Sequence, residues 1–497
     1  MPRITSPRRF RSIASALLAA LTAMSACSVG PDYERPTAPM APAYKETTEG
    51  WKVAEPRDDI ARGAWWEIYG DPDLNDLMEQ VNAANQDLQT AEAQFRQART
   101  LVWAARSNWY PTASLSVSAT RSRLSGTLNP SQGGSAGNAG KVVNEFSMPL
   151  GVSWELDVWG RIRRLVESNN ASAQASAADV ESTRLSLQAE LASDYFQLRT
   201  LDGDRQILDQ SAEAFDKSLR LTQSRFEGGV ASRADVAQAE TQLQTTQAQA
   251  IDLGVQRAQL EHAIAVLIGV PASSFSIPPQ PLTQTPPAVP VGIPSELLER
   301  RPDVAAAERL VASANAQIGV AVAAYYPTIT LSADGGFASG TFSDWFNWPS
   351  RIWSFGPGAA EVVFDGGLRA AQTAQARAAY DGNVASYRQS VLVAFQEVED
   401  SLAALRILEE ESHVLDLAVT SALDSVRLTT NRYKEGTASY LDVVVTQTTA
   451  LTNQRSAVDV LGRRMVANVQ LVQALGGGWN ASALPTSHDL SADRPLM

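Results

Sequence analysis

The sequence predicts a mainly α-helical fold that is duplicated along the chain and carries a small β-sheet, and three observations predict it. Residues 221–236 align without a gap with residues 428–443, and eight of the sixteen positions are identical. Proline is absent from residues 161–227 and 369–479, so very long helices can form there. Short segments in which polar and apolar residues alternate precede each of these stretches, as is typical of strands.

The duplication divides the chain into two copies, residues 72–270 and residues 295–475, about 207 residues apart. Between them, residues 271–294 contain eight prolines, which exclude a helix or a central strand and predict a semi-rigid connector that runs along a surface. After the second copy, residues 476–497 are expected to form a short, polar and poorly ordered tail.

Each copy is expected to contain a helix, two strands, a very long helix, a turn and a second long helix. In the first copy the opening helix is predicted over residues 72–108, where Pro111 stops it. Four segments have the period-two pattern of strands: residues 114–119, 146–157, 328–332 and 353–365.

The predicted long helices have narrow apolar seams in place of a broad apolar face. Apolar residues step by three or four positions along each seam, as in packed coiled coils: Leu187, Leu191, Tyr195, Leu198 and Leu201, then Val391, Phe395, Val398, Leu402 and Leu405. At 1.5 Å per residue, a helix over residues 161–227 would be about 100 Å long. Such helices cannot be buried in one core, so they are expected to form an extended bundle or the wall of a tube.

The N-terminus has the features of an export signal. Residues 1–26 begin with a basic, acid-free head, continue into a short apolar run and end in small residues, which predicts a signal peptide. Cys27, the only cysteine, follows Met24-Ser25-Ala26 and so resembles the acylated cysteine of a bacterial lipobox. Residues 27–71 are then a lipid-anchored, extended segment. A signal peptide beside an unmodified Cys27 is the alternative.

Composition excludes several classes of protein. The formal net charge is −13, so nucleic acid is not an expected partner. Beyond the N-terminus no stretch has the 18 or more apolar residues of a spanning helix. One cysteine rules out a disulfide framework, and the three histidines have no neighbouring ligands, so neither a metal site nor a cofactor is expected. Because no nucleotide-binding or nucleophile motif is complete, we do not expect an enzyme.

Four strands in one chain are too few to cross a membrane alone. Open sheet edges are not tolerated in hydrocarbon, and the smallest single-chain barrels have about eight strands. Chains must therefore pool strands: two chains would make eight and three would make twelve. Aromatic residues near the strand ends fit the interfacial girdles of such a barrel, with ordinary hairpin packing as the alternative: Trp109, Tyr110, Tyr325, Tyr326, Phe342, Trp345, Phe346, Trp348 and Trp353.

Several motifs follow one another in order along the mature chain. They are Cys27-Ser28-Val29-Gly30-Pro31-Asp32-Tyr33, Trp65-Trp66-Glu67-Ile68-Tyr69-Gly70-Asp71-Pro72, Tyr-Pro-Thr at residues 110 and 326, Trp154-Glu155-Leu156-Asp157-Val158-Trp159-Gly160-Arg161, Glu299-Arg300-Arg301-Pro302-Asp303-Val304 and Phe364-Asp365-Gly366-Gly367. Together they resemble the outer-membrane efflux proteins, the trimeric exit ducts of bacterial multidrug pumps, and the lipoprotein branch of that family in particular.

The resemblance implies a homotrimer with a twelve-stranded β-barrel in the outer membrane, continued by a long α-helical tunnel in the periplasm. It also implies a covalent lipid on Cys27, and Ser28 at the next position favours sorting to the outer membrane. The implied partners are outer-membrane lipid, a periplasmic adaptor (membrane fusion) protein and an inner-membrane transporter.

Two turns join the long helices and are expected to form the tip farthest from the membrane. Glycine ends one helix and serine starts the next in both turns, and the resemblance implies that an adaptor docks there: Gly228, Gly229, Ala231, Ser232, Gly436, Thr437 and Ser439. Charged and aromatic residues beside the turns are candidates for a periplasmic gate that opposite charges hold closed: Arg225, Asp235, Arg432, Tyr433 and Asp442. Val445 stands where the family often has an aspartate, so a carboxylate ring at that level is in doubt, and Asp442 is its possible substitute.

The sequence therefore predicts a passive, gated exit duct for drugs or other small toxic compounds. Two alternatives remain: the exit duct of a type I protein secretion system, and a non-channel periplasmic coiled-coil scaffold tethered by its lipid. Since no nucleotide motif exists, any energy must come from a partner.

Overall fold

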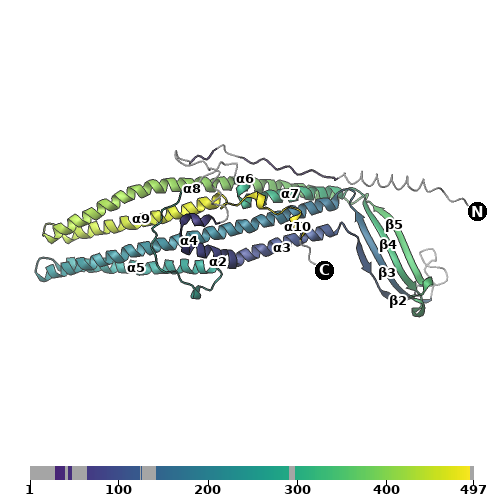
Figure 1. Cartoon of the computed structure of the whole chain (residues 1–497), viewed down its shortest axis with the longest axis horizontal. Coiled ribbons are helices and arrows are strands. Elements are labelled where there is room, and N and C mark those ends of the chain that lie inside the picture. Colours follow the sequence, from purple (N-terminus) through teal and green to yellow (C-terminus); the bar gives the residue numbers. More distant parts are fainter. Residues whose placement is uncertain are drawn as a thin grey trace, which may run out of the picture.

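A computed structural model describes residues 28–39, 43–46, 64–123, 125, 141–289 and 297–492 of the chain. The protein is elongated, with long helices along most of its length and one β-sheet at one end (Figure 1). The prediction of a mainly helical protein with a small sheet is confirmed. None of the described helices combines the length and the apolar character that a bilayer-spanning helix needs. The predicted signal peptide and Cys27 lie outside the described residues.

The two halves of the chain contain helices of matching length in the same order. The pairs are α3 (Gln86–Ser107) and α7 (Pro302–Ala323) with 22 residues, α4 (Arg161–Glu227) and α8 (Leu368–Lys434) with 67, and α5 (Arg233–Leu267) and α9 (Tyr440–Ala474) with 35. Because the lengths match, the α4–α5 and α8–α9 hairpins both extend to the end of the molecule opposite the sheet (Figure 1). Shorter helices are α2 (Pro72–Ala84), α6 (Leu297–Arg300) and α10 (Asp489–Ala492).

The long helices bury the seams that the sequence predicted. On α4 the side chains of Leu191, Tyr195 and Leu198 are fully buried, and on α8 those of Val391 and Val398 are. Helix α4 packs against α5, α7 and α9, and α8 packs against α7 and α9. The apolar core is thus a line of small clusters along the bundle, which leaves polar side chains on the other helix faces.

The single opening helix predicted over residues 72–108 is wrong, because the chain breaks at Asn85. This residue ends α2 and caps α3: its side chain accepts hydrogen bonds from the backbone N–H groups of Asp87 and Leu88, at 2.9 and 3.0 Å. Its Nδ2 donates to the carbonyl oxygen of Leu267 at 2.8 Å, so the break is tied to the end of α5. Asparagine is a strong N-cap residue, and this local preference overrides the continuous helical pattern.

We expect Asn85→Ala to lower the free energy of unfolding by about 1–2 kcal/mol, because it removes a cap and leaves the Leu267 carbonyl without its buried donor. The apparent melting temperature of the detergent-solubilised protein measures this loss. Asn383→Ala is the matched control, since Asn383 lies exposed in the middle of α8 and donates only to the carbonyl of Ala379. Equal melting temperatures for the two variants would contradict the proposed role of the break.

Four rows of antiparallel strand form the sheet. The first row consists of β1 (Thr112–Leu115) and β2 (Ser118–Arg123), which both pair with β3 (Val142–Leu156); β4 (Thr328–Ser339) and β5 (Arg351–Ala360) follow in order. The register is the same on both sides of the β1–β2 interruption, where Ser116 donates to the carbonyl of Pro149 at 3.0 Å. Pro149 has no N–H to return, so the ladder is interrupted there. The strands extend beyond most of the predicted segments, although β5 ends before residues 361–365.

The chain before and after the two copies is better ordered than the sequence suggested. Residues 65–69 form a 3-10 helix in which Trp65, Trp66 and Tyr69 are buried, so the segment 27–71 is not extended throughout. The prediction of a poorly ordered tail is wrong for residues 476–492. Leu490 is only 1% exposed against Val102 and Ala173, and its carbonyl accepts a hydrogen bond from Trp103 Nε1 at 3.1 Å.

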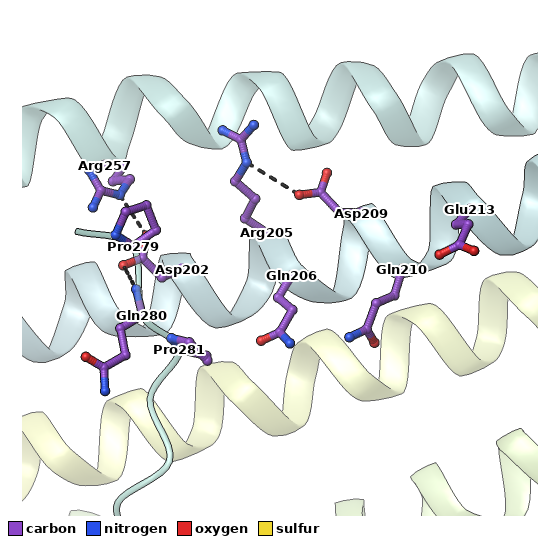
Figure 2. Close-up of a pocket in the computed structure, with 10 residues that line it drawn as sticks. All are labelled: Asp202, Arg205, Gln206, Asp209, Gln210, Glu213, Arg257, Pro279, Gln280 and Pro281. Carbon is purple, nitrogen blue, oxygen red and sulfur yellow. Dashed lines mark hydrogen bonds and ion pairs between the residues drawn. The ribbon is translucent and has the colours of Figure 1, made fainter.

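Buried charges fasten the proline-rich connector to the helices. Asp202 on α4 has a side chain that is only 2% exposed; it accepts from Arg257 Nε at 2.7 Å and from the backbone N–H of Gln280 at 2.9 Å. Arg257 Nη2 donates to the carbonyl of Ile277, which is itself buried. A polar groove of about 780 Å³ lies beside this contact, lined by α4, α5 and the connector (Figure 2). The described part of the connector, residues 271–289, is therefore bound through buried groups as well as lying along the surface.

Candidate functional site

The sheet has one apolar and one polar face, and the strand register defines both. Residues that pair across the strands share a face. The first face carries large apolar side chains: Leu115, Met148, Leu150, Val152, Trp154, Leu331, Phe337, Trp353 and Phe355. The opposite face carries small hydroxylated side chains: Thr112, Ser114, Ser118, Thr120, Ser122, Ser147, Ser153, Thr328, Thr330, Ser332 and Ser354. An apolar face toward lipid and a polar face toward a lumen is the pattern of a transmembrane barrel.

The sheet is open at both sides within one chain. Among the described strands, the β1–β2 row pairs only with β3, and β5 pairs only with β4. Nearly every residue of these two outer rows is exposed. Unpaired backbone groups cost several kcal/mol each in hydrocarbon, so the two edges must find partners in a membrane. Both edges carry the same two-faced pattern, and pairing β5 of one chain with the β1–β2 row of another would keep each face continuous.

Aspartates turn each sheet strand into a long helix. Asp157 accepts from the backbone N–H groups of Ile162 and Arg163 at 2.8 and 2.9 Å, which caps α4. Asp365 does the same for α8, accepting from the N–H groups of Gly367 and Arg369 at 2.9 and 3.1 Å. The Arg369 side chain also donates to Asp365 and, with these backbone bonds, lowers the pKa of that carboxyl to about 2.

Protonation of Asp365 is therefore expected to weaken the junction between barrel and tunnel. Because the folded-state pKa lies near 2 and the ordinary value is 3.8, the stabilisation is fully present above about pH 4 and is lost as the pH falls toward 2. We expect Asp365→Asn to melt at a lower temperature than the parent protein at neutral pH and to converge with it near pH 2. A constant difference across this range would contradict the assignment.

The aromatic residues predicted as girdles lie at the ends of the strands. Trp353 is 83% exposed, and Trp109, Tyr110, Tyr325 and Tyr326 are exposed near the helices. Trp345 differs: it is 7% exposed, because Phe146, Phe342 and Phe346 pack around it. For Trp345 the alternative of hairpin packing is therefore correct.

The two tip turns are built alike. In the first, Gly229 adopts a φ of 72°, and the N–H of Val230 donates back to the carbonyl of Arg225 at 2.8 Å. In the second, Gly436 adopts a φ of 82°, and the N–H of Thr437 donates to the carbonyl of Arg432 at 2.9 Å. A left-handed glycine with this six-to-one hydrogen bond is the Schellman way of ending a helix.

Serine and aspartate then start the next helix in both turns. Ser232 Oγ accepts from the N–H of Asp235, while Asp235 accepts from the N–H of Ser232. Ser439 and Asp442 form the same capping box. The pKa of Asp442 is lowered, chiefly by the hydrogen bonds from Ser439 and to a smaller degree by the charge of Arg432. Both aspartates thus have a local role at the helix start that the sequence-based gate did not include.

One contact joins the two hairpins at the tip. Arg225 Nη1 donates to the carbonyl of Tyr433 at 2.6 Å, and the guanidinium lies over the Tyr433 ring, 4.5 Å from its centroid. Tyr433 is buried against Tyr440 and within 3.3 Å of Thr222 on α4. The structure thus brings two of the predicted gate residues together, as cation and helix C-terminus and not as an ion pair.

The positions that correspond to this contact in the other copy are exposed. Arg432 corresponds to Arg225 in the alignment of the two copies, and Phe226 corresponds to Tyr433. Phe226 is 41% exposed, and Arg432 is exposed as well. Each chain therefore presents at its tip half of a contact on one hairpin and the other half on the second hairpin. Val445 is also exposed, on α9, and supplies no carboxylate.

Comparison with known proteins gives consistent matches over nearly the whole chain. The family described as outer membrane efflux protein matches residues 77–270 and 293–477. The toluene efflux pump outer membrane protein TtgC and the antibiotic efflux pump outer membrane protein ArpC of Pseudomonas putida are both 31% identical, over 97% of this chain and 99% of theirs. The solved outer-membrane channel OprN is 32% identical, with a TM-score of 0.83 over 91% of this chain and all of that one.

Proposed function

The chain belongs to the outer membrane efflux protein family, and from this we propose that three copies join their sheets into one twelve-stranded barrel. The protein is the outer-membrane channel of an efflux pump, with its helices in the periplasm. The observation that carries the trimer is the open, two-faced sheet: four strand rows with two unpaired edges cannot seal against lipid. Three chains supply twelve strands and place every Ser/Thr face toward one lumen.

Planar-bilayer recordings test the channel together with its assembly state. Purified protein is expected to give discrete conductance steps and to migrate as a trimer on gels until it is heated. A monomer that conducts no ions would contradict the proposal. This outcome would instead favour the lipid-tethered scaffold.

We propose that Cys27 carries the lipid that anchors the N-terminus. The support is the position of the next residues: Val29 donates its N–H to the carbonyl of Trp159 at 3.1 Å, at the junction of sheet and helices. From there the chain runs along the outside of the helices, where Asp32 pairs with Arg164 at 2.8 Å and Glu46 pairs with Arg406 at 2.8 Å. A lipid on Cys27 would enter the membrane beside the barrel. Intact-mass measurement of the mature protein detects the lipid, and an unmodified Cys27 would contradict the proposal.

We propose that a periplasmic adaptor, itself bound to an inner-membrane transporter, docks on the tip turns. The supporting observation is their exposure at the end of two rigid hairpins: Gly228, Gly229, Ser232, Gly436, Thr437 and Ser439 are exposed, and Ala231 is half-buried. A photo-crosslinking residue in place of Thr437 tests this, with one in place of Gln86, near the middle of the bundle, as the control. Equal yields of adaptor adduct at both positions would contradict the docking role.

We propose that Arg225, Asp235, Arg432, Tyr433 and Asp442 hold the tip closed in the resting channel. Since Arg225 already joins the two hairpins of one chain, the exposed Arg432 and Asp442 are available to the neighbouring chain. One exposed ion pair contributes only about 0–1 kcal/mol, so the threefold repetition is needed for an effective closure.

Arg432→Ala combined with Asp442→Ala is expected to increase the leak conductance of the isolated channel, because both charges leave the tip. Ser439→Ala is the control: it removes the capping box and keeps both charges. Unchanged conductance in the double variant would contradict this pairing. An equal rise in Ser439→Ala would assign the effect to the lost cap.

We propose small toxic organic compounds as the cargo, because the relatives named above serve toluene and antibiotic efflux pumps. The lumen face of hydroxyl groups has no element that would select one compound, so selection belongs to the transporter. Deleting the gene should sensitise cells to toluene or antibiotics and leave the set of secreted proteins unchanged. Loss of one secreted protein without drug sensitivity would favour type I secretion instead.

A further inference from the structure

The end of the sheet farthest from the helices is basic in an otherwise acidic protein. Arg121 and Arg123 lie at this end of β2, and Arg351 begins β5. The connection between β2 and β3, residues 124–141, contains one lysine and no acidic residue. The connection between β4 and β5, residues 340–350, contains only Asp344, which accepts hydrogen bonds from Thr341 and Asn347. The whole chain has a formal charge of −13, so this local excess of positive charge is specific to one end.

The register places these arginines on the lipid-facing side. Arg121 pairs with Asn144, two positions from Phe146 on the same face, and Arg351 pairs with Phe337. Phe337 belongs to the apolar face, together with Trp353, which follows Arg351 by two positions. The guanidinium of Arg351 lies over the ring of Trp348, 3.0 Å from its centroid, and its Nε donates to the Trp348 carbonyl. An arginine on an aromatic residue just beyond an apolar belt is at the level of lipid headgroups.

The carboxylates of the sheet lie on the opposite face. Glu145 pairs with Thr120, Glu155 pairs with Thr330 and Asp334 pairs with Ser354, so all three point toward the polar lumen. Asp334 also accepts from the Ser354 hydroxyl at 3.2 Å, on that same side. Within the described strands, therefore, the outer face has arginines at its far end and no acidic residue. The complementary charge must come from outside the protein.

We propose that the arginines form a binding site for phosphorylated lipid headgroups of the outer leaflet, at each seam between chains. The site rests on the proposed trimer. The first and last strand rows are the two open edges, so pairing them end to end places Arg351 of one chain beside Arg121 of its neighbour. Guanidinium groups bind phosphate oxygens in a bidentate manner, and an anionic headgroup bridging both arginines would fasten the seam from the lipid side.

The test uses the full-length trimer in phosphatidylcholine nanodiscs with and without diphosphoryl lipid A. Native mass spectrometry counts bound lipid A, and thermal melting reports seam stability. Arg121→Gln with Arg351→Gln is expected to weaken lipid A binding about tenfold or more and to abolish the stabilisation by lipid A. Arg220→Gln with Arg427→Gln is the matched control, because it removes the same charge from exposed positions on α4 and α8.

Each outcome separates this site from the assembly itself. Both variants should remain trimeric and conduct normally in plain phosphatidylcholine, which shows that the barrel is intact. Equal lipid A binding by the two double variants would overturn the proposal. Displacement of lipid A by millimolar inorganic phosphate would also overturn it in favour of a simple anion site. A chain that is not trimeric in plain nanodiscs would contradict the proposed assembly and not the charge argument.

Discussion

Gly336→Val is expected to prevent the sheet from forming. Gly336 lies in the middle of β4, opposite Pro149 on β3, and a Cβ there would stand 2.2 Å from the main-chain carbonyl oxygen of Met148. This obstacle is backbone, so no side-chain rotation relieves it. Overpacking costs about 1–3 kcal/mol where side chains can yield, and more is expected here, three times per trimer. Outer-membrane fractionation should show little assembled trimer, and cells carrying only this variant should be as sensitive to toxic compounds as a deletion strain.

Gly335→Val is the matched control for that result. Its Cβ would meet no atom within 4 Å, because position 335 faces outward beside Trp353. Valine also suits a lipid-facing strand better than glycine does. We expect a normal yield of trimer from this variant. Similar loss of assembly in both variants would show that any side chain in this part of β4 is harmful and would contradict the specific clash at residue 336.

The sequence predicted the long elements well because their signals are repeated over many residues. The bounds of α4, residues 161–227, followed from the absence of proline and from the next glycine turn. The seam of Leu187, Leu191, Tyr195 and Leu198 is buried as the spacing indicated. The misses are local. Asn85 breaks a helix through one side chain, and the tail is ordered by Leu490, a single apolar residue whose partners are hundreds of positions away.

Strand extents were harder to predict because the membrane faces contain both small and large residues. The first row continues to Arg123 through Ser, Thr and Arg residues that carry little β-signal on their own. Their place in the sheet follows from pairing with β3, a long-range contact that one sequence does not reveal. The faces, in contrast, were readable from the alternation, since a period of two separates lipid-facing from lumen-facing residues whatever the exact strand ends are.

At the tip, the sequence identified the residues but not their partners. Capping boxes were foreseeable from Ser232 with Asp235 and from Ser439 with Asp442, since serine followed three positions later by a carboxylate is a known start signal. The contact of Arg225 with Tyr433 depends on how two hairpins lie side by side, and the copies differ there: phenylalanine stands at residue 226 in place of tyrosine. This difference breaks the symmetry of the repeat, so the contact within a chain and the contact between chains cannot be the same.

Arg225→Ala is expected to open the resting channel several-fold in leak conductance. The variant removes a charge-assisted hydrogen bond to the end of α8 and a cation–π contact with Tyr433, together about 2–4 kcal/mol at each of three positions. Nothing else described in the structure ties the α4 end to the α8 end with a charge. Freed from α4, the α8–α9 hairpin can splay outward, and planar-bilayer recordings should show larger steps. Arg220→Ala removes the same charge one turn earlier, where the side chain is exposed and pairs only with Asp216, so its conductance should match the parent channel. If Arg225→Ala conducts no better than Arg220→Ala, the contact between the hairpins does not close the channel, and the closure must lie between chains, at Arg432 and Phe226.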